Sequence, residues 1–172
     1  MIFKGNKYAY DQARKQLRQL YKEKAISCYK PPKASEKLYY IDSPLGIHAL
    51  KLIDVYAELL GLGADIKTFH KKYRIYTSND KYREIDALME LYYDGYFIPL
   101  IVEIDYSHNT SMIKLQEIYQ SGHFQEKYKD IDNDIFPLIV IVRPVLSENM
   151  EECELPMLYV DFRLGNLVTA LQ

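Results

Sequence analysis

Apolar side chains recur at spacings of three and four over residues 8–24, which predicts an amphipathic helix. Its apolar face carries Ala13, Leu17, Leu20 and Tyr21. Four cationic side chains are expected largely elsewhere on the helix surface: Arg14, Lys15, Arg18 and Lys22. Two strand-like segments, 25–30 and 37–41, follow and are joined by a polar turn that opens with two prolines. This order is typical of a helix-turn-helix with a β-wing, in which residues 10–24 form the recognition helix.

A β-hairpin is the clearest element in the rest of the chain. The predicted strands 83–93 and 96–105 flank Asp94-Gly95, a strong signal for a two-residue hairpin turn. Pro99 has no N–H to donate to a neighbouring strand, so we expect an edge position or a β-bulge there. Five further elements are predicted from the same periodicities: helices at 43–63 and 109–129, and strands at 71–77, 136–144 and 155–162.

The order of these elements predicts a mixed sheet. Strand 96–105, helix 109–129 and strand 136–144 form a crossover, which implies a parallel pair with a right-handed connection. The expected fold class is therefore α/β (α+β), with a winged-helix-like segment followed by a mixed β-sheet with flanking helices. Three regions are predicted: a partial winged helix-turn-helix at 1–42, a linking helix at 43–70 and an αβ domain at 71–172.

Composition changes this picture mainly through charge. The chain has 172 residues, of which 48% are hydrophobic, enough for a folded core. No apolar run is long enough to span a membrane, and the first residues lack the apolar centre of a signal peptide, so we expect a cytoplasmic protein without a membrane partner. Residues 1–40 carry a net charge of +7, although the whole chain carries −2. A basic head on an acidic body favours a polyanionic partner.

Duplex DNA is the expected partner of this basic head. The residues predicted to contact it are three lysines of the wing and four cations of the helix: Lys30, Lys33 and Lys37, and Arg14, Lys15, Arg18 and Lys22. A solvated basic helix without a partner is one alternative. Another is a non-DNA protein-interaction module, in which residues 8–24 form the interface of a homodimer.

Acidic residues mark the two strands of the hairpin. Asp86 lies on the first strand, and Glu103 and Asp105 share one face at the end of the second. We expect Asp86 and Glu103 to approach each other across the pair. With Asp105, they are candidate ligands for Mg²⁺ or Mn²⁺, which can activate water for phosphodiester cleavage. The alternative is that these acids only bind neighbouring arginines or backbone N–H groups.

This arrangement resembles the core of PD-(D/E)xK nucleases, in which an Asp on one strand precedes Glu-x-Lys on the next. Asp86 matches the first acid and Glu103 the second. Asp105 stands where the family has Lys, and Ile85 where it has Pro. The resemblance implies a catalytic role for Asp86 and Glu103, with Lys114 on the following helix as a displaced cation.

A resemblance that covers nearly the whole chain is to the replication-relaxation family of plasmids and conjugative elements. It is carried by the order and spacing of five stretches: ARKQLRQLYKEKAI, EKLYYIDSPLGIHAL, EIDALMEL, VEIDYSHNTSMIKLQEIY and FPLIVIV. The resemblance implies DNA binding in replication, relaxation or mobilisation of an element, with a relaxase or replication protein as partner. It does not imply an active nuclease, so we expect a degenerate nuclease-like body with no cofactor, or with Mg²⁺ or Mn²⁺ if the acidic site is active. The family has an extra helix before the stretch that begins here at Met1, so we expect either that this is a fragment or that the first helix is supplied by something else.

Overall fold

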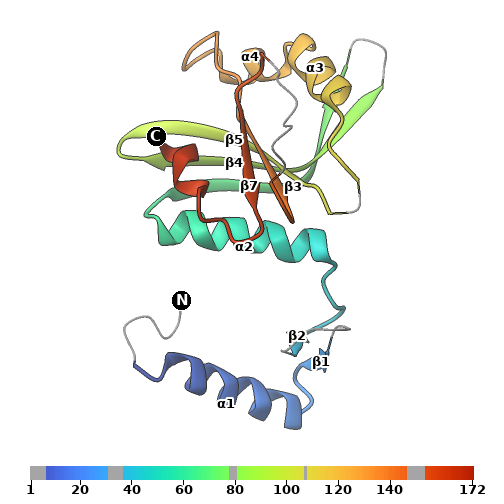
Figure 1. Ribbon diagram of the computed structural model, residues 1–172, viewed down its shortest axis with the longest axis vertical. Helices are drawn as coiled ribbons and strands as arrows, with labels where there is room; N and C mark the ends of the chain where they lie inside the picture. The colour runs from blue at the N-terminus through green and yellow to red at the C-terminus, as the bar shows by residue number, and fades with distance from the viewer. Residues whose placement is uncertain (1–6, 31–36, 78–80, 107, 147–153) are drawn as a thin grey trace. The chain divides into compact units, whose positions relative to one another are not determined.

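The computed structural model describes residues 7–30, 37–77, 81–106, 108–146 and 154–172. The chain forms two compact units, Met1–Gly46 and Ile47–Gln172, called unit 1 and unit 2 below. Figure 1 shows their elements in chain order, with unit 1 in blue and unit 2 from cyan to red. Each unit is described by itself.

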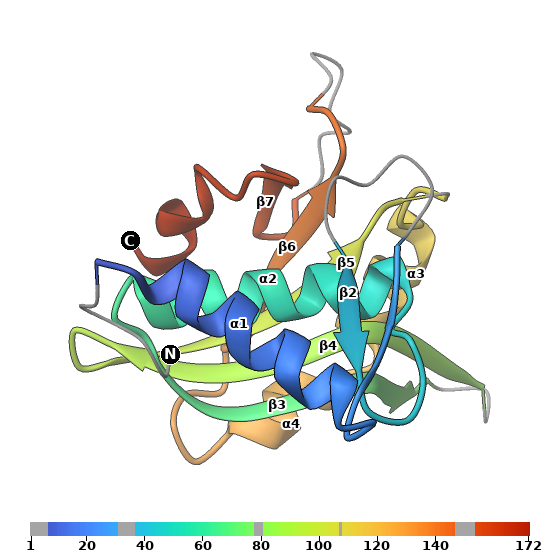
Figure 2. The same cartoon turned by 90° about the horizontal axis from the view of Figure 1, so that it is seen from below.

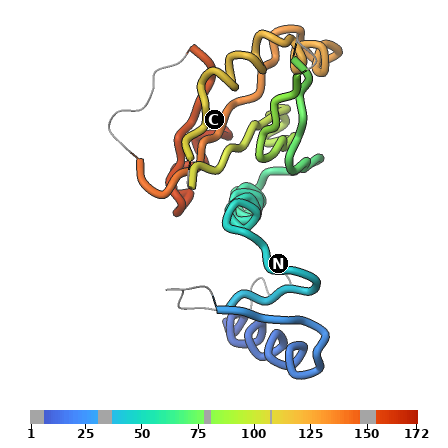
Figure 3. The backbone as a smooth tube through the Cα atoms, turned by 90° about the vertical axis from the view of Figure 1, so that its right-hand side faces the viewer, coloured from blue at the N-terminus to red at the C-terminus, as the bar shows by residue number. Residues whose placement is uncertain are grey.

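Unit 1 consists of one helix and a two-stranded antiparallel pair in the part that the structure describes. The helix is α1 (Ala9–Lys22), and the strands are β1 (Ser27–Tyr29) and β2 (Leu38–Tyr40) (Figure 3). The predicted order of helix, strand and strand is therefore confirmed. None of the described residues of this unit is buried, because so small an assembly has no interior.

Unit 2 is built on a five-stranded mixed sheet in the order β3-β4-β5-β6-β7. Its strands are β3 (Asp65–Tyr76), β4 (Tyr82–Tyr93), β5 (Tyr96–Ile104), β6 (Leu138–Arg143) and β7 (Met157–Asp161). The first three strands are antiparallel, whereas β5, β6 and β7 are parallel, which confirms the predicted crossover pair. The turn between β4 and β5 (Figure 2) has positive φ at both Asp94 and Gly95, as a type I′ hairpin turn requires.

Helices cover both faces of this sheet (Figure 1). α2 (Ile47–Gly61) and the 3₁₀ helix η1 (Leu167–Leu171) contribute to one apolar cluster with one face of the sheet. α3 (Met112–Gln120) and α4 (His123–Tyr128) contribute to a second cluster with the opposite face. Unit 2 is therefore a three-layer αβ assembly, and the predicted mixed sheet with flanking helices is correct.

Three expectations differ from the structure: the linking region, the extent of one helix and the position of Pro99. The predicted linking region 43–70 is not separate, because α2 packs on the sheet of unit 2 and β3 already begins at Asp65. The predicted helix 109–129 is two helices, which Gly122 separates with a φ of 68°.

The expectation for Pro99 is wrong, because β5 is an interior strand without a bulge at that residue. Pro99 pairs with Glu90 of β4, but the pairing of β5 with β6 begins one residue later, at Leu100. No strand therefore lies against Pro99 on the β6 side, where the missing N–H would otherwise break the ladder.

Candidate functional site

The sheet register of unit 2 brings the two predicted catalytic acids together. Ala87 of β4 and Val102 of β5 form the last pair of their ladder, and Asp86 and Glu103 lie directly beyond it on the two strands, close enough for the charge of Asp86 to act on Glu103. Asp86 turns to the backbone, and its Oδ2 accepts a hydrogen bond of 2.8 Å from the Ile104 N–H. Nδ1 of His48, in the first turn of α2, lies 3.7 Å from the same oxygen. Asp86 is thus held at the strand pair by two neighbours.

Glu103 forms a buried ion pair with the predicted displaced cation. Nζ of Lys114 lies 2.7 Å from Glu103 Oε1 and also donates to the carbonyl oxygen of Glu84 at 3.1 Å. Lys114 projects from the first turn of α3, which Ser111 caps by accepting from the Lys114 N–H. The N-cap therefore positions the lysine above the end of β5.

Burial dominates the electrostatics of this pair. Only 4% of Glu103 is exposed, and desolvation raises the pKa of its carboxyl from 4.5 to about 7. The Lys114 cation opposes this rise, whereas the charges of Asp86 and Asp105 add to it. Glu103 is thus a carboxyl group that can exchange a proton near neutral pH.

Asp105, the acid at the position of the nuclease lysine, is fully occupied by other partners. Its Oδ1 accepts from the N–H and the hydroxyl of Thr110, at 2.8 and 2.7 Å. Its Oδ2 accepts from Nη2 of Arg143 at 2.7 Å, and the Arg143 guanidinium lies 4.5 Å from the Tyr159 ring. Asp105 therefore ties the segment after β5 to the end of β6, and this arrangement favours an anchoring role over metal binding.

Asp86 and Glu103 could supply oxygen ligands to a cation, but few further ligands from the described residues lie near them. Within the described ranges, no group of three or more His, Cys, Asp or Glu side chains is arranged to hold a metal ion. Asp86 and Glu103 remain the two acids whose oxygens are suited to Mg²⁺ or Mn²⁺, but Lys114 already binds one Glu103 oxygen. The local arrangement is thus three carboxylates around two cations, Lys114 and Arg143.

Sequence reasoning missed a third buried acid, Glu90 of β4. It accepts hydrogen bonds from Thr68 at 2.5 Å and from Tyr128 at 2.8 Å, and Nζ of Lys127 lies 3.0 Å away. Burial by itself would raise the pKa of Glu90, but these three partners outweigh it and lower that pKa. Glu90 therefore joins β3, β4 and α4 through a charged centre beneath the helices.

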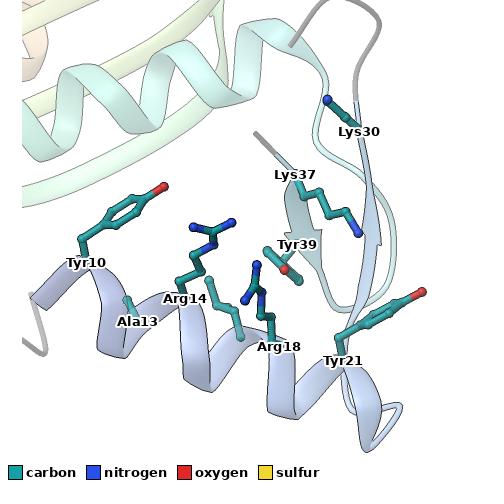
Figure 4. A pocket seen from close by; sticks show the side chains of 9 residues that line it. Tyr10, Ala13, Arg14, Arg18, Tyr21, Lys30, Lys37 and Tyr39 are labelled. Atoms are coloured by element: carbon teal, nitrogen blue, oxygen red, sulfur yellow. The ribbon is translucent and has the colours of Figure 1, made fainter. Parts of the chain in front are cut away.

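Unit 1 contains the second candidate site, a groove of about 520 Å³ between α1 and the β1–β2 pair (Figure 4). Its lining combines four cations and three tyrosines with two apolar side chains: Arg14, Arg18, Lys30 and Lys37, Tyr10, Tyr21 and Tyr39, and Ala13 and Leu17. Arg14 and Arg18 extend from α1 toward the strand pair in Figure 4. We call this surface the unit 1 groove.

The groove places the predicted DNA-binding residues in two sets. Arg14 and Arg18 border the apolar stripe of α1 and line the groove, although they were expected elsewhere on the helix. Lys15 and Lys22 lie along a neighbouring hollow of α1 that they share with Arg14 and Arg18. Lys33 lies outside the described residues. Lys30 and Lys37, which were predicted on the wing, supply the opposite wall.

Electrostatically, the groove is a concentration of positive charge. No ion pair of Arg14, Arg18, Lys30 or Lys37 occurs among the residues that the structure describes. All four side chains are exposed. Uncompensated cations on facing walls attract a polyanion that follows the groove.

Comparison with known proteins does not assign the chain: no family model matches it, and no curated protein does. Among the described residues, none of the helices has the length and apolar character that crossing a membrane requires.

Proposed function

We propose that the protein binds duplex DNA through unit 1. The observation that carries the proposal is the convergence of Arg14 and Arg18 of α1 with Lys30 and Lys37 of the strand pair on one groove, whose lining contains no acid among the residues that the structure describes. Lys15 and Lys22 extend this charge along α1. In this proposal α1 lies in the major groove and the strand pair holds the phosphate backbone.

The resemblance to the replication-relaxation family supports a more specific role. The protein would act on the DNA of a plasmid or conjugative element, in its replication, relaxation or mobilisation. Unit 2 would then be a nuclease-like body that contacts a relaxase, a replication protein or a second copy of the chain. The buried ion pairs at the ends of β5 and β6 support a structural use of the acids in this body.

A gel-shift series on the full chain tests DNA binding. The triple variant Arg14→Glu, Lys15→Glu and Arg18→Glu should abolish duplex binding at low salt. For the unmodified protein, the logarithm of the affinity should fall linearly with the logarithm of the salt concentration. Replacing the same three residues by Gln should make that slope shallower by about 3, because each phosphate contact contributes about 0.9.

A matched control places the same charge change on unit 2. Lys71, Lys72 and Lys81 are exposed, and changing all three to Glu gives the same net charge as the unit 1 variant. Equal loss of binding in both triple variants would show a non-specific effect of net charge. Duplex binding that is absent at low salt in the unmodified protein would refute the proposal.

A second candidate function is a metal-dependent endonuclease. The observation that favours it is the 2.7 Å contact of Lys114 with Glu103, beside Asp86, in the arrangement that the nuclease resemblance implies. Lys114 would orient the attacking water, and Asp86 and Glu103 would hold Mg²⁺ or Mn²⁺. Supercoiled plasmid should then be nicked when either ion is added. Nicking that is absent, or that persists in Glu103→Ala, would rule this function out.

A further inference from the structure

The unit 1 groove has features that duplex binding does not use. We infer that it binds unpaired DNA, with phosphates on its cations and bases stacked on its tyrosines. This inference rests on the proposed DNA-binding function and gives each class of DNA its own part of unit 1: the duplex would contact the outer surfaces of α1 and the strand pair, and an unpaired strand would enter the groove between them.

The shape of the groove favours a narrow ligand. Its volume of about 520 Å³ lies in the range of small-molecule pockets, roughly 300–1,000 Å³. A duplex receives a protruding protein element in its own major groove, about 12 Å wide. A hollow of the protein instead accepts something that protrudes from the nucleic acid, such as an unstacked nucleotide.

The tyrosines supply surfaces that only unpaired bases can use. Tyr10 and Tyr21 of α1 are 62% and 47% exposed, and Tyr39 of β2 lines the same groove (Figure 4). In a duplex the faces of each base are covered by its neighbours, so an aromatic side chain cannot stack on them. Unpaired bases expose these faces, and stacking on aromatic rings is the common way in which proteins hold a single strand without reading its sequence.

The cations are placed to follow a strand backbone past these rings. Arg14 and Arg18 are four residues apart and therefore neighbours on the same side of α1. Lys30 and Lys37 stand on the opposite wall. Positive charge on both walls, together with three tyrosines in the lining, combines the electrostatic groove and the stacking surface that single-strand binding requires.

The first test needs no variant. Fluorescence anisotropy on the full chain compares a labelled oligothymidylate of about 12 nucleotides with an abasic strand of the same length and with a duplex. The two single strands carry the same phosphates and differ only in their bases. The thymidylate should bind at least about fivefold more tightly, which is the smallest factor expected from one stacked base. Equal affinity of the two strands would overturn the inference.

Three variants then locate the stacking. Tyr21→Ala and Tyr39→Ala should each weaken thymidylate binding about fivefold or more and leave abasic binding unchanged. Tyr21→Phe keeps the ring and should retain affinity. Tyr96→Ala is the matched control, because Tyr96 is 75% exposed in unit 2. Loss of affinity in this control as large as in the groove variants would also overturn the inference.

The outcomes separate the inference from the proposed function. Binding of the duplex without binding of either single strand would refute the inference and leave duplex binding intact. Failure to bind any of the three ligands at low salt would refute both. Binding of thymidylate and duplex, with the Tyr variants impaired only on thymidylate, would support both.

Discussion

Replacing Glu103 by Gln should remove a pH dependence from the stability of unit 2. In the folded protein, burial raises the pKa of Glu103 from 4.5 to about 7. Between these two values the unfolded chain has released the proton, whereas the folded chain still holds it. The contribution of this group to stability is therefore fully present below pH 4.5 and is lost as the pH rises toward 7.

The size of the effect follows from the difference between the two pKa values. A rise from 4.5 to about 7 corresponds to about 3 kcal/mol, at about 1.4 kcal/mol for each pH unit. The unmodified protein should lose this amount between pH 4.5 and pH 8, on top of changes from its other groups. The Glu103→Gln variant has no ionisable group at this position, so its stability should change only through the other titratable groups. The variant should therefore gain about 3 kcal/mol relative to the unmodified protein over this range.

Urea unfolding followed by circular dichroism, at closely spaced pH values, measures this difference. Glu126→Gln is the matched control, since Glu126 is exposed and pairs with Lys129 at the surface of α4. Lys114→Met gives a second check, because loss of the cation should raise the Glu103 pKa further and extend the loss of stability to higher pH. Stability curves of Glu103→Gln and the unmodified protein that run parallel across the range would refute the reasoning.

Two further predictions concern the other buried charges. Arg143→Met should destabilise the protein by about 3–5 kcal/mol, because it leaves Asp105 buried without its cation, and the double variant with Asp105→Asn should recover part of that loss in urea unfolding. Tyr128→Phe removes a hydrogen bond to the buried Glu90 carboxylate and should cost about 1.5–3 kcal/mol. An unchanged urea midpoint in Tyr128→Phe would show that this bond contributes nothing, and the same variant made with Glu90→Gln should cost less than the sum of the two single changes.

The residues of the acidic site whose positions depend on local structure could be predicted from the sequence. The alternation of side chains along a strand and the Asp94-Gly95 turn were sufficient to place Asp86 beside Glu103. Lys114 follows from the nuclease resemblance, and the structure places it on Glu103. These relations lie within one hairpin and the helix directly after it, where sequence distance is short and register is fixed by the turn.

The residues that were missed depend on longer-range pairing. Arg143 meets Asp105 only because β6 runs parallel to β5, with Val142 opposite Ile104. Glu90 meets Tyr128, which is 38 residues away, through the packing of α4 on the sheet. For the pair of Arg143 and Asp105, the sequence offered one signal, an arginine directly after the apolar run of β6. Its partner could not be identified without the strand register.

The unit 1 groove shows a different limit. Helical periodicity identifies an apolar stripe on α1, but it assigns Arg14 and Arg18 to a polar surface because their side chains are charged. In the structure the strand pair lies opposite the border of that stripe, so that these arginines become part of a concave surface. The position of a short strand pair against a helix is decided by few contacts, and these have no distinct period in the sequence.

The charge balance around Glu103 bears on what unit 2 can do. Asp105 in place of a lysine does not leave the site without positive charge, because Lys114 reaches Glu103 from α3. Arg143 neutralises Asp105 itself. A divalent ion at Asp86 and Glu103 would have to share Glu103 with Lys114, which already binds one of its oxygens. The Lys114→Met variant distinguishes two roles of this lysine. If Lys114 orients the attacking water, the variant should lose nicking. If Lys114 only competes with the ion for Glu103, the variant should bind the divalent ion more tightly.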